Sequence, residues 1–257
     1  MANILNIKNI FKINISVYVL ALIAILTASF KEFLTIIYLI VIHEIGHSLA
    51  AFSLGIKVKE IRIYPLGGIS KFDMPLNINP LKELIVLING PLFQEIAYRV
   101  ASIVIPSQIS LISTYHYNIL VFNLLPIYPL DGGKLLKLIT DNFISYKKSL
   151  KIVILISYIM IIAFLLKVEI ISINTIIICI FLLYLITKEE KKINYIYNKF
   201  LLERYLGNYK FKDTTIIKSI NNFHRNKNHL VKVGQKYYSE KDVLKEKYNK
   251  TEKNCWL

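Results

Sequence analysis

Cysteine and acidic residues are both scarce in this chain of 257 residues, which has 2 Cys and only 17 Asp and Glu against 32 Lys and Arg. Cys179 lies in an apolar run and Cys255 in a polar tail, so we expect no disulfide framework and a reducing location for the tail. No internal repeat or low-complexity linker is evident. No small-residue cleavage site follows the first apolar segment, which we therefore interpret as a retained anchor.

The shortage of acidic groups leaves a net charge of +15. Residues 188–257 carry 17 Lys and Arg against 8 Asp and Glu, scattered among Asn, Ile and Tyr without a motif that reads nucleic acid. We therefore predict no nucleic-acid partner. The basic tail is expected to contact the anionic headgroups of the lipid bilayer, or an acidic protein.

Long apolar runs dominate the rest of the chain. The hydrophobic fraction of 54% and the mean hydropathy of +0.48 indicate an α-helical polytopic membrane protein. Each of six segments is near the length that crosses about 30 Å of hydrocarbon. These segments are 13–30, 33–54, 82–105, 111–128, 150–167 and 170–187. Lys and Arg gather after the second and fourth segments, which predicts a multi-pass protein of the cell membrane with both termini in the cytoplasm.

The composition changes abruptly after Thr187, where charged and aromatic residues replace the apolar run. We predict a transmembrane domain over 1–187, an amphipathic linker over 188–210 and a small α/β cytoplasmic module over 211–257. That module could also be a small amphipathic domain that docks on the membrane or pairs with another copy, so a homo-oligomer stays open.

Three ionisable side chains interrupt the second apolar segment: His43, Glu44 and His47. On a helix the two histidines share a face and the glutamate borders it, so the imidazoles can hold Zn²⁺ while the carboxylate takes a proton from water. Charged or polar groups at this depth are costly without a partner, and a metal ion is a suitable one. The segment predicts a zinc site for peptide hydrolysis.

A second polar segment ends the fourth apolar run, from Asn123 to Lys134. Pro126 and Pro129 interrupt the helix, and an acid on non-helical backbone at membrane depth is tolerated only beside a polar cavity. Asp131 is therefore the expected third zinc ligand, and three protein ligands leave one position open for water.

Between the second and third segments, Val58 to Tyr64 alternates polar and apolar residues and Ile69 to Phe72 forms another short apolar run. We predict a membrane-associated β-hairpin whose edge could pair with an extended substrate, or else a simple connector loop. Pro91, in Asn89-Gly90-Pro91, predicts a kink in the third segment.

The paired motifs His43-Glu44-Ile45-Gly46-His47 and Asn123-x-x-Pro126-x-x-Pro129-Leu130-Asp131-Gly132 resemble the site-2 protease family of intramembrane metalloproteases. The likeness extends through Tyr64-Pro65-Leu66-Gly67-Gly68 and Asn89-Gly90-Pro91. It implies zinc bound by His43, His47 and Asp131, with Glu44 as the base. It also implies that Asn123 and Pro129 position the substrate.

The sporulation branch of that family is the most similar, which implies the pro-segment of a late sporulation sigma factor as substrate. It also implies inhibitory membrane protein partners and the mother-cell membrane around the forespore as location. The tail resembles a truncated cystathionine-β-synthase-type module, which adds ATP as a candidate ligand. We read its residues 214–223 as a helix, 230–233 as a strand and 238–244 as a capped helix.

Alternative functions remain open at this stage: cleavage of a membrane-bound anti-sigma factor, zinc transport, or a non-proteolytic regulatory role. Other polar residues have simpler explanations. Glu95 and Arg99 are expected to form an ion pair, and His116 to lie at the membrane interface. We expect His224 and His229 to be solvated in the polar tail.

Overall fold

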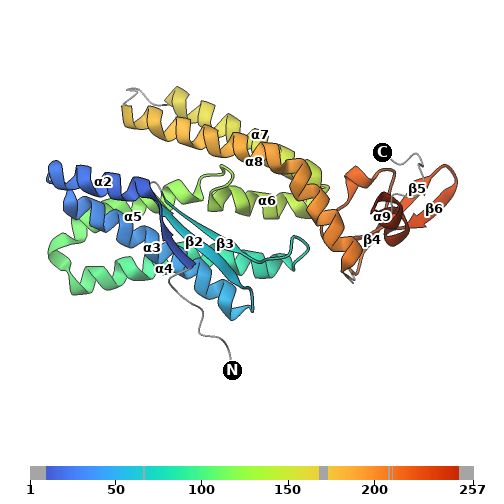
Figure 1. Cartoon of the computed structure of the whole chain (residues 1–257), viewed down its shortest axis with the longest axis horizontal. Coiled ribbons are helices and arrows are strands. Elements are labelled where there is room, and N and C mark those ends of the chain that lie inside the picture. The colour runs from blue at the N-terminus through green and yellow to red at the C-terminus, as the bar shows by residue number, and fades with distance from the viewer. Residues whose placement is uncertain (1–9, 66, 168–172, 208, 210, 249–257) are drawn as a thin grey trace. The chain divides into compact units, whose positions relative to one another are not determined.

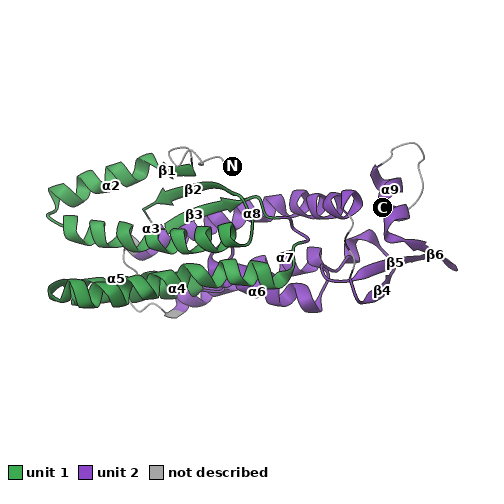
Figure 2. Cartoon of the chain, turned by 90° about the horizontal axis from the view of Figure 1, so that it is seen from below, with its two compact units in different colours: residues 1–74, 78–124 green, residues 75–77, 125–257 purple. Residues whose placement is uncertain are grey.

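The computed structural model describes residues 10–65, 67–167, 173–207, 209 and 211–248. Leu66, Cys255 and the start of the predicted segment 170–187 lie outside these residues. The chain divides into two compact units, which Figure 2 colours separately. Unit 1 comprises Met1–Met74 and Ile78–Leu124, and unit 2 comprises Pro75–Asn77 and Leu125–Leu257.

Unit 1 combines apolar helices with a small sheet (Figure 1). Its elements are β1 (Phe11–Ile13), α2 (Ile15–Leu26), α3 (Phe30–Ser53), β2 (Val58–Tyr64), β3 (Gly67–Phe72), α4 (Pro80–Val104), a 3₁₀ turn (Pro106–Gln108) and α5 (Ile109–Leu124). The predicted hairpin is confirmed: β2 and β3 pair antiparallel from Tyr64 opposite Gly67 to Val58 opposite Phe72. Strand β1 adds to β2 in parallel.

The sheet packs against the helix that carries the histidines. Ile61 and Ile63 on β2 form a buried cluster with Ile40 on α3 and Val17 on α2. Such burial of aliphatic side chains stabilises by about 1.5 to 3 kcal/mol each. Capping fixes where the next helix starts, because Asn79 Oδ1 accepts a hydrogen bond from the Leu81 N–H at 2.9 Å and Pro80 follows the cap.

Unit 2 joins two long helices to the C-terminal module. Its elements are α6 (Asp131–Phe143), α7 (Tyr146–Lys167), α8 (Ile173–Leu206), β4 (Thr214–Ile217), a 3₁₀ turn (Ile220–Asn222), β5 (Asn228–Val233), β6 (Lys236–Ser239) and α9 (Glu240–Tyr248). Helix α8 continues without a break through Thr187, where the composition changes. The domain boundaries inferred from composition stay a prediction.

Among the described residues, two helices are long and apolar enough to cross a membrane, at Phe30–Ser53 and Tyr146–Leu166. Pro80–Val104 and Pro106–Leu124 pass the same test together, with a bend of 115°, and count as a third span if the pair is one broken crossing. Six spans are therefore not confirmed, although α2, α3, α4, α5, α7 and α8 overlap the six apolar segments.

The module's sheet runs β4-β5-β6, with β4 parallel to β5 and β5 antiparallel to β6. The expected strand at 230–233 and the capped helix are confirmed, and Ser239 Oγ accepts from the Asp242 N–H at 3.2 Å. The expected helix over 214–223 is wrong: it is a strand followed by a 3₁₀ turn. The β-branched run from Thr214 to Ile217 favours a strand once β5 is available to pair with it.

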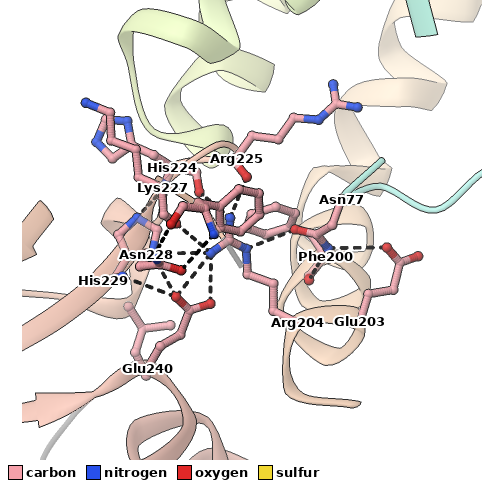
Figure 3. A network of polar contacts seen from close by, with 12 residues as sticks. Asn77, Phe200, Glu203, Arg204, His224, Arg225, Lys227, Asn228, His229 and Glu240 are labelled. Carbon is pink, nitrogen blue, oxygen red and sulfur yellow. Dashed lines mark hydrogen bonds and ion pairs between the residues drawn. The ribbon is translucent and has the colours of Figure 1, made fainter. Parts of the chain in front are cut away.

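A buried arginine ties the end of α8 to this module (Figure 3). The Arg204 side chain is 1% exposed and donates to Glu240 Oε1 at 2.8 Å and to Asn77 Oδ1 at 2.9 Å. It also donates to three backbone carbonyls, those of His224, Arg225 and Lys227. A buried charge is tolerated when its hydrogen bonds are satisfied in this way.

The two histidines of the module are not solvated as expected. His229 is 2% exposed, and its Nε2 accepts from the His224 N–H at 2.8 Å while Nδ1 lies 3.2 Å from Glu240 Oε2. Burial lowers the pKa of both His229 and His224. The His229 ring is part of the module core, and His224 is half-buried beside it. A cystathionine-β-synthase-type module is not confirmed.

Candidate metal centre and its hydrogen-bonded supports

The histidines of the second apolar segment face each other on α3, inside unit 1. His43 and His47 are 3% and 4% exposed, and their Nε2 atoms lie 3.1 Å apart. Their spacing of four residues puts both rings on one helix face, as the sequence predicts. The two nitrogens are close enough to bind a single ion.

The opposite nitrogen of each ring contacts an oxygen. His47 Nδ1 lies 2.7 Å from the Val86 carbonyl oxygen on α4, and His43 Nδ1 lies 3.0 Å from the amide oxygen of Gln94. An oxygen that accepts there requires a proton on Nδ1, which leaves a lone pair on Nε2. Two converging lone pairs repel each other unless a cation lies between them. The pair therefore fits a bound zinc ion, which takes neutral imidazole nitrogen.

The β-hairpin brings a hydroxyl group into hydrogen-bonding contact with the glutamate that lies between these histidines in the sequence. Glu44 is 5% exposed, and Ser70 Oγ on β3 donates to its Oε2 at 2.5 Å. The backbone of β3 also lies directly against this side chain, since a Cβ on Gly68 would stand 2.2 Å from Glu44 Cγ. Glycine at this position thus lets the hairpin hold the carboxylate.

Two further glycines bring α4 onto α3 beside the histidines. A Cβ on Gly90 would lie 2.3 Å from both Cε1 and Nε2 of His47. A Cβ on Gly46 would lie 2.3 Å from the Asn89 backbone oxygen. The motif Asn89-Gly90-Pro91 therefore has a steric role at the His47 ring, while α4 itself continues through Pro91.

Asp131 begins α6 in unit 2. It is 7% exposed, and Lys134 Nζ donates to its Oδ1 at 2.9 Å. The loop before it packs tightly on α6, because a Cβ on Gly133 would lie 2.4 Å from the Ile127 backbone carbon. Ser157 on α7 accepts from the Tyr128 N–H at 2.8 Å and anchors this loop. The sequence predicts an acid on non-helical backbone, but Asp131 is the first residue of α6, and the non-helical stretch ends at Leu130.

The two residues expected to position substrate fall in different units. Asn123 lies in the last turn of α5 in unit 1 and is half-buried. Pro129 lies in unit 2, two residues before α6, and is also half-buried. Their role in substrate binding stays a prediction.

Sequence reasoning missed two residues here, Gln94 and Ser70. His116 is fully buried inside unit 1 and contacts Gln94 and Glu95. Its expected place at the membrane interface stays a prediction. The ion pair of Glu95 with Arg99 is confirmed, at 2.7 Å. Gln94 and Ser70 carry no motif of their own. An amide inside an apolar segment was the available signal for Gln94, because a buried amide requires hydrogen-bond partners.

Comparison with known proteins identifies the family. The model of peptidase family M50 matches residues 32–108 and 95–166, a stretch that contains both histidines, Glu44 and Asp131. The chain belongs to peptidase family M50. Stage IV sporulation protein FB of Bacillus subtilis is 32% identical over 200 residues, which cover 74% of this chain and 69% of that protein.

Two further comparisons match this chain to protein sequence and structure from Methanocaldococcus jannaschii. A zinc metalloprotease is 35% identical over 131 residues, covering 47% of this chain and 37% of that longer protein. The solved structure of a site-2 protease superposes with a TM-score of 0.56 and 26% identity, covering 74% of this chain and 93% of that chain. The chain is a zinc metalloendopeptidase of the site-2 protease type.

Proposed function

We propose that this M50 peptidase hydrolyses a peptide bond in a membrane-associated protein, at or near the cytoplasmic side of the bilayer. His43, His47 and Asp131 are the proposed zinc ligands and Glu44 is the general base. The observation that carries this assignment is the arrangement on α3: two histidines whose Nδ1 atoms each contact an oxygen, with Nε2 atoms 3.1 Å apart, beside a buried carboxylate.

Asp131 completes the proposed ligand set by its chemistry. It is buried and, with the two imidazoles, offers the mixture of nitrogen and carboxylate oxygen ligands that catalytic zinc accepts. Asp131 is the first residue of α6, so its carboxylate lies at the positive end of the helix dipole, where a negative charge is stabilised.

The reaction follows from these groups. A zinc ion held by His43, His47 and Asp131 would supply a Lewis acid for the scissile carbonyl and would lower the pKa of water towards about 7. The Glu44 carboxylate takes a proton as the water oxygen adds to the carbonyl carbon. It then gives that proton to the amide nitrogen as the C–N bond breaks. Ser70, which donates to Glu44 Oε2, holds the carboxylate in place during both transfers. Asn123 and Pro129 are proposed to align the substrate segment.

The proposed substrate is the pro-segment of a late sporulation sigma factor. The 32% identity to stage IV sporulation protein FB supports this choice over an anti-sigma factor. The same likeness supports inhibitory membrane protein partners and the mother-cell membrane around the forespore as location.

The proposed topology places both termini in the cytoplasm. The domains proposed are 1–187, 188–210 and 211–257. ATP binding in the tail has no support from the comparisons.

Co-expression with each candidate substrate tests the proposal. Glu44→Gln should abolish cleavage while zinc stays bound, an outcome that a zinc transporter or a silent regulator would not give.

Asp131→Ala should lose zinc as well as activity. Asn123→Ala should keep zinc and cleave more slowly, because the scissile bond is misaligned. Full zinc occupancy in Asp131→Ala would show that the third ligand lies elsewhere. Cleavage by Glu44→Gln at the wild-type rate would contradict the mechanism.

A further inference from the structure

A chain of hydrogen bonds leads away from His43 through the interior of unit 1. His43 Nδ1 lies 3.0 Å from Gln94 Oε1, and Gln94 Nε2 lies 3.0 Å from the backbone oxygen of His116. His116 Nε2 lies 3.0 Å from Glu95 Oε2, and Arg99 donates to Glu95 Oε1 at 2.7 Å. Gln94 and His116 are both 0% exposed. Neither the proposed ligand set nor the proposed base includes these residues.

One contact fixes which group donates in each hydrogen bond of this series. The backbone oxygen of His116 can only accept, so the Gln94 atom that faces it must be the amide nitrogen. The amide oxygen therefore faces His43, whose Nδ1 must donate and whose Nε2 must keep its lone pair. With the amide turned the other way, His43 would carry its proton on Nε2 and could not bind a metal there.

The same donor-to-acceptor order holds for the hydrogen bonds that lead on to the Glu95 carboxylate. The Gln94 nitrogen also lies 3.3 Å from His116 Nδ1, which accepts and leaves the His116 proton on Nε2. That proton is donated to Glu95. Every donor in the chain thus points towards the negative charge of Glu95. Hydrogen bonds aligned in this way polarise one another, and a more electron-rich imidazole binds a metal more tightly.

We propose that Gln94 is a positioning residue for the metal: it holds His43 in the tautomer that binds zinc and links that ring, through His116, to the charge of Glu95. This inference rests on the proposed zinc site. A metal-bound histidine commonly donates its other N–H to a carboxylate. Here an amide and a second histidine separate the two, which places the charge away from the reaction.

The alternative is that the buried amide only stabilises the packing of α4 and α5. A merely structural role would lower the stability of the folded protein and leave the intrinsic zinc affinity unchanged. Zinc affinity and the visible spectrum of the cobalt-substituted protein, both measured on folded samples, separate the two roles.

The experiment compares Gln94→Leu and Glu95→Gln with wild type in the full-length protein in detergent. Gln108→Leu is the matched control, because Gln108 is an exposed glutamine of the same unit. The zinc dissociation constant is measured by competition with a chelator. We expect Gln94→Leu to bind zinc about 10- to 100-fold more weakly and to shift the cobalt absorption bands. Glu95→Gln should give a smaller loss in the same direction, and Gln108→Leu none.

Wild-type zinc affinity in folded Gln94→Leu would overturn the proposal. If Gln94→Leu does not fold, His116→Phe and Glu95→Gln decide. His116→Phe keeps the backbone oxygen that orients Gln94 and the ring that stacks on Tyr98, but cuts the link to Glu95. Unchanged zinc affinity in both would equally overturn the proposal. Failure of the wild type to bind zinc would instead overturn the metal site itself.

Discussion

At the residue scale, substitution of Gly90 tests how closely the chain packs around the two histidines. Alanine is normally better than glycine inside a helix by about 1 kcal/mol. In Gly90→Ala, however, the new Cβ would lie 2.3 Å from His47 Nε2 and push the ring aside. Since a misplacement of about 1 Å can cost about 100-fold in rate, we expect a loss of that order in cleavage, together with reduced zinc content.

The control for this change is Ile88→Ala, an exposed position on the same helix. It removes more side chain than the glycine variant adds, yet should keep both zinc and activity. Full zinc content and full cleavage in Gly90→Ala would mean that α4 can move away from the ring at no cost, contrary to the close packing of Gly46 on Asn89.

Ser70 gives a second prediction at this scale. Ser70→Ala removes the hydroxyl that donates to Glu44 Oε2, and a hydrogen bond to a charged group contributes about 1.5 to 3 kcal/mol. We expect cleavage to slow by about tenfold or more while the zinc content stays the same. Ser70→Thr keeps a hydroxyl and should retain most of the activity. Equal rates for the alanine variant and wild type, measured on one substrate, would exclude this support role.

At the scale of elements, the C-terminal module should lose stability in mild acid. Burial lowers the pKa of His229 and His224 below the ordinary value of 6.5. As pH falls below 6.5, the unfolded module therefore binds more protons than the folded module. The free energy of unfolding of the module decreases as a result. Protonation of His229 Nε2 would also oppose the His224 N–H that donates to it.

Glu240 contributes in a more acidic range. Burial alone would raise its pKa, but the His229 hydrogen bond and the Arg204 charge outweigh burial and lower the pKa below 4.5. The contribution of Glu240 to the stability of the module is present above pH 4.5 and is lost only as pH falls further.

Hydrogen exchange tests the expected loss of stability in mild acid. Residues 211–248 in the intact protein should show protection at about pH 7.5 that declines at about pH 5.5. His229→Gln should show a smaller decline. Equal protection of the wild type at both pH values would contradict the prediction.

Elements also show where local sequence is a weak guide. Thr214 to Ile217 carries apolar residues that suit either a helix or a strand, and its pairing with β5 decides for the strand. The alternation in Val58 to Tyr64 has no such ambiguity, because period two places Ile61 and Ile63 on the buried face of a sheet. That hairpin could be predicted, and it is present.

For the whole molecule, the distribution of basic residues predicts a cytoplasmic tail. Lys232 is exposed on β5, so Lys232→Cys in a background without Cys179 and Cys255 should not react with an impermeant thiol reagent added to intact cells. It should react once the cells are permeabilised. Lys31→Cys, an exposed position at the start of α3 that is expected to face the outside, is the positive control. Labelling of position 232 from outside would overturn the proposed topology.

The sequence by itself determined the helix face that His43 and His47 share, the hairpin and the apolar character of the chain. Each follows from a local rule: two histidines four apart must share a helix face, alternation must give a strand, and long apolar runs cannot remain in water. The positions of His43, Glu44 and His47 needed nothing more than this spacing.

Only the tertiary structure decided which oxygen contacts Nδ1 of each histidine. The Val86 carbonyl and the Gln94 amide lie on α4, more than 35 residues away along the chain, and Ser70 reaches Glu44 from a strand. Likewise His116 and His229 look exposed in sequence, yet both are buried by elements distant in the chain. Hydrogen bonds between distant segments depend on how the chain packs, and no local periodicity encodes them.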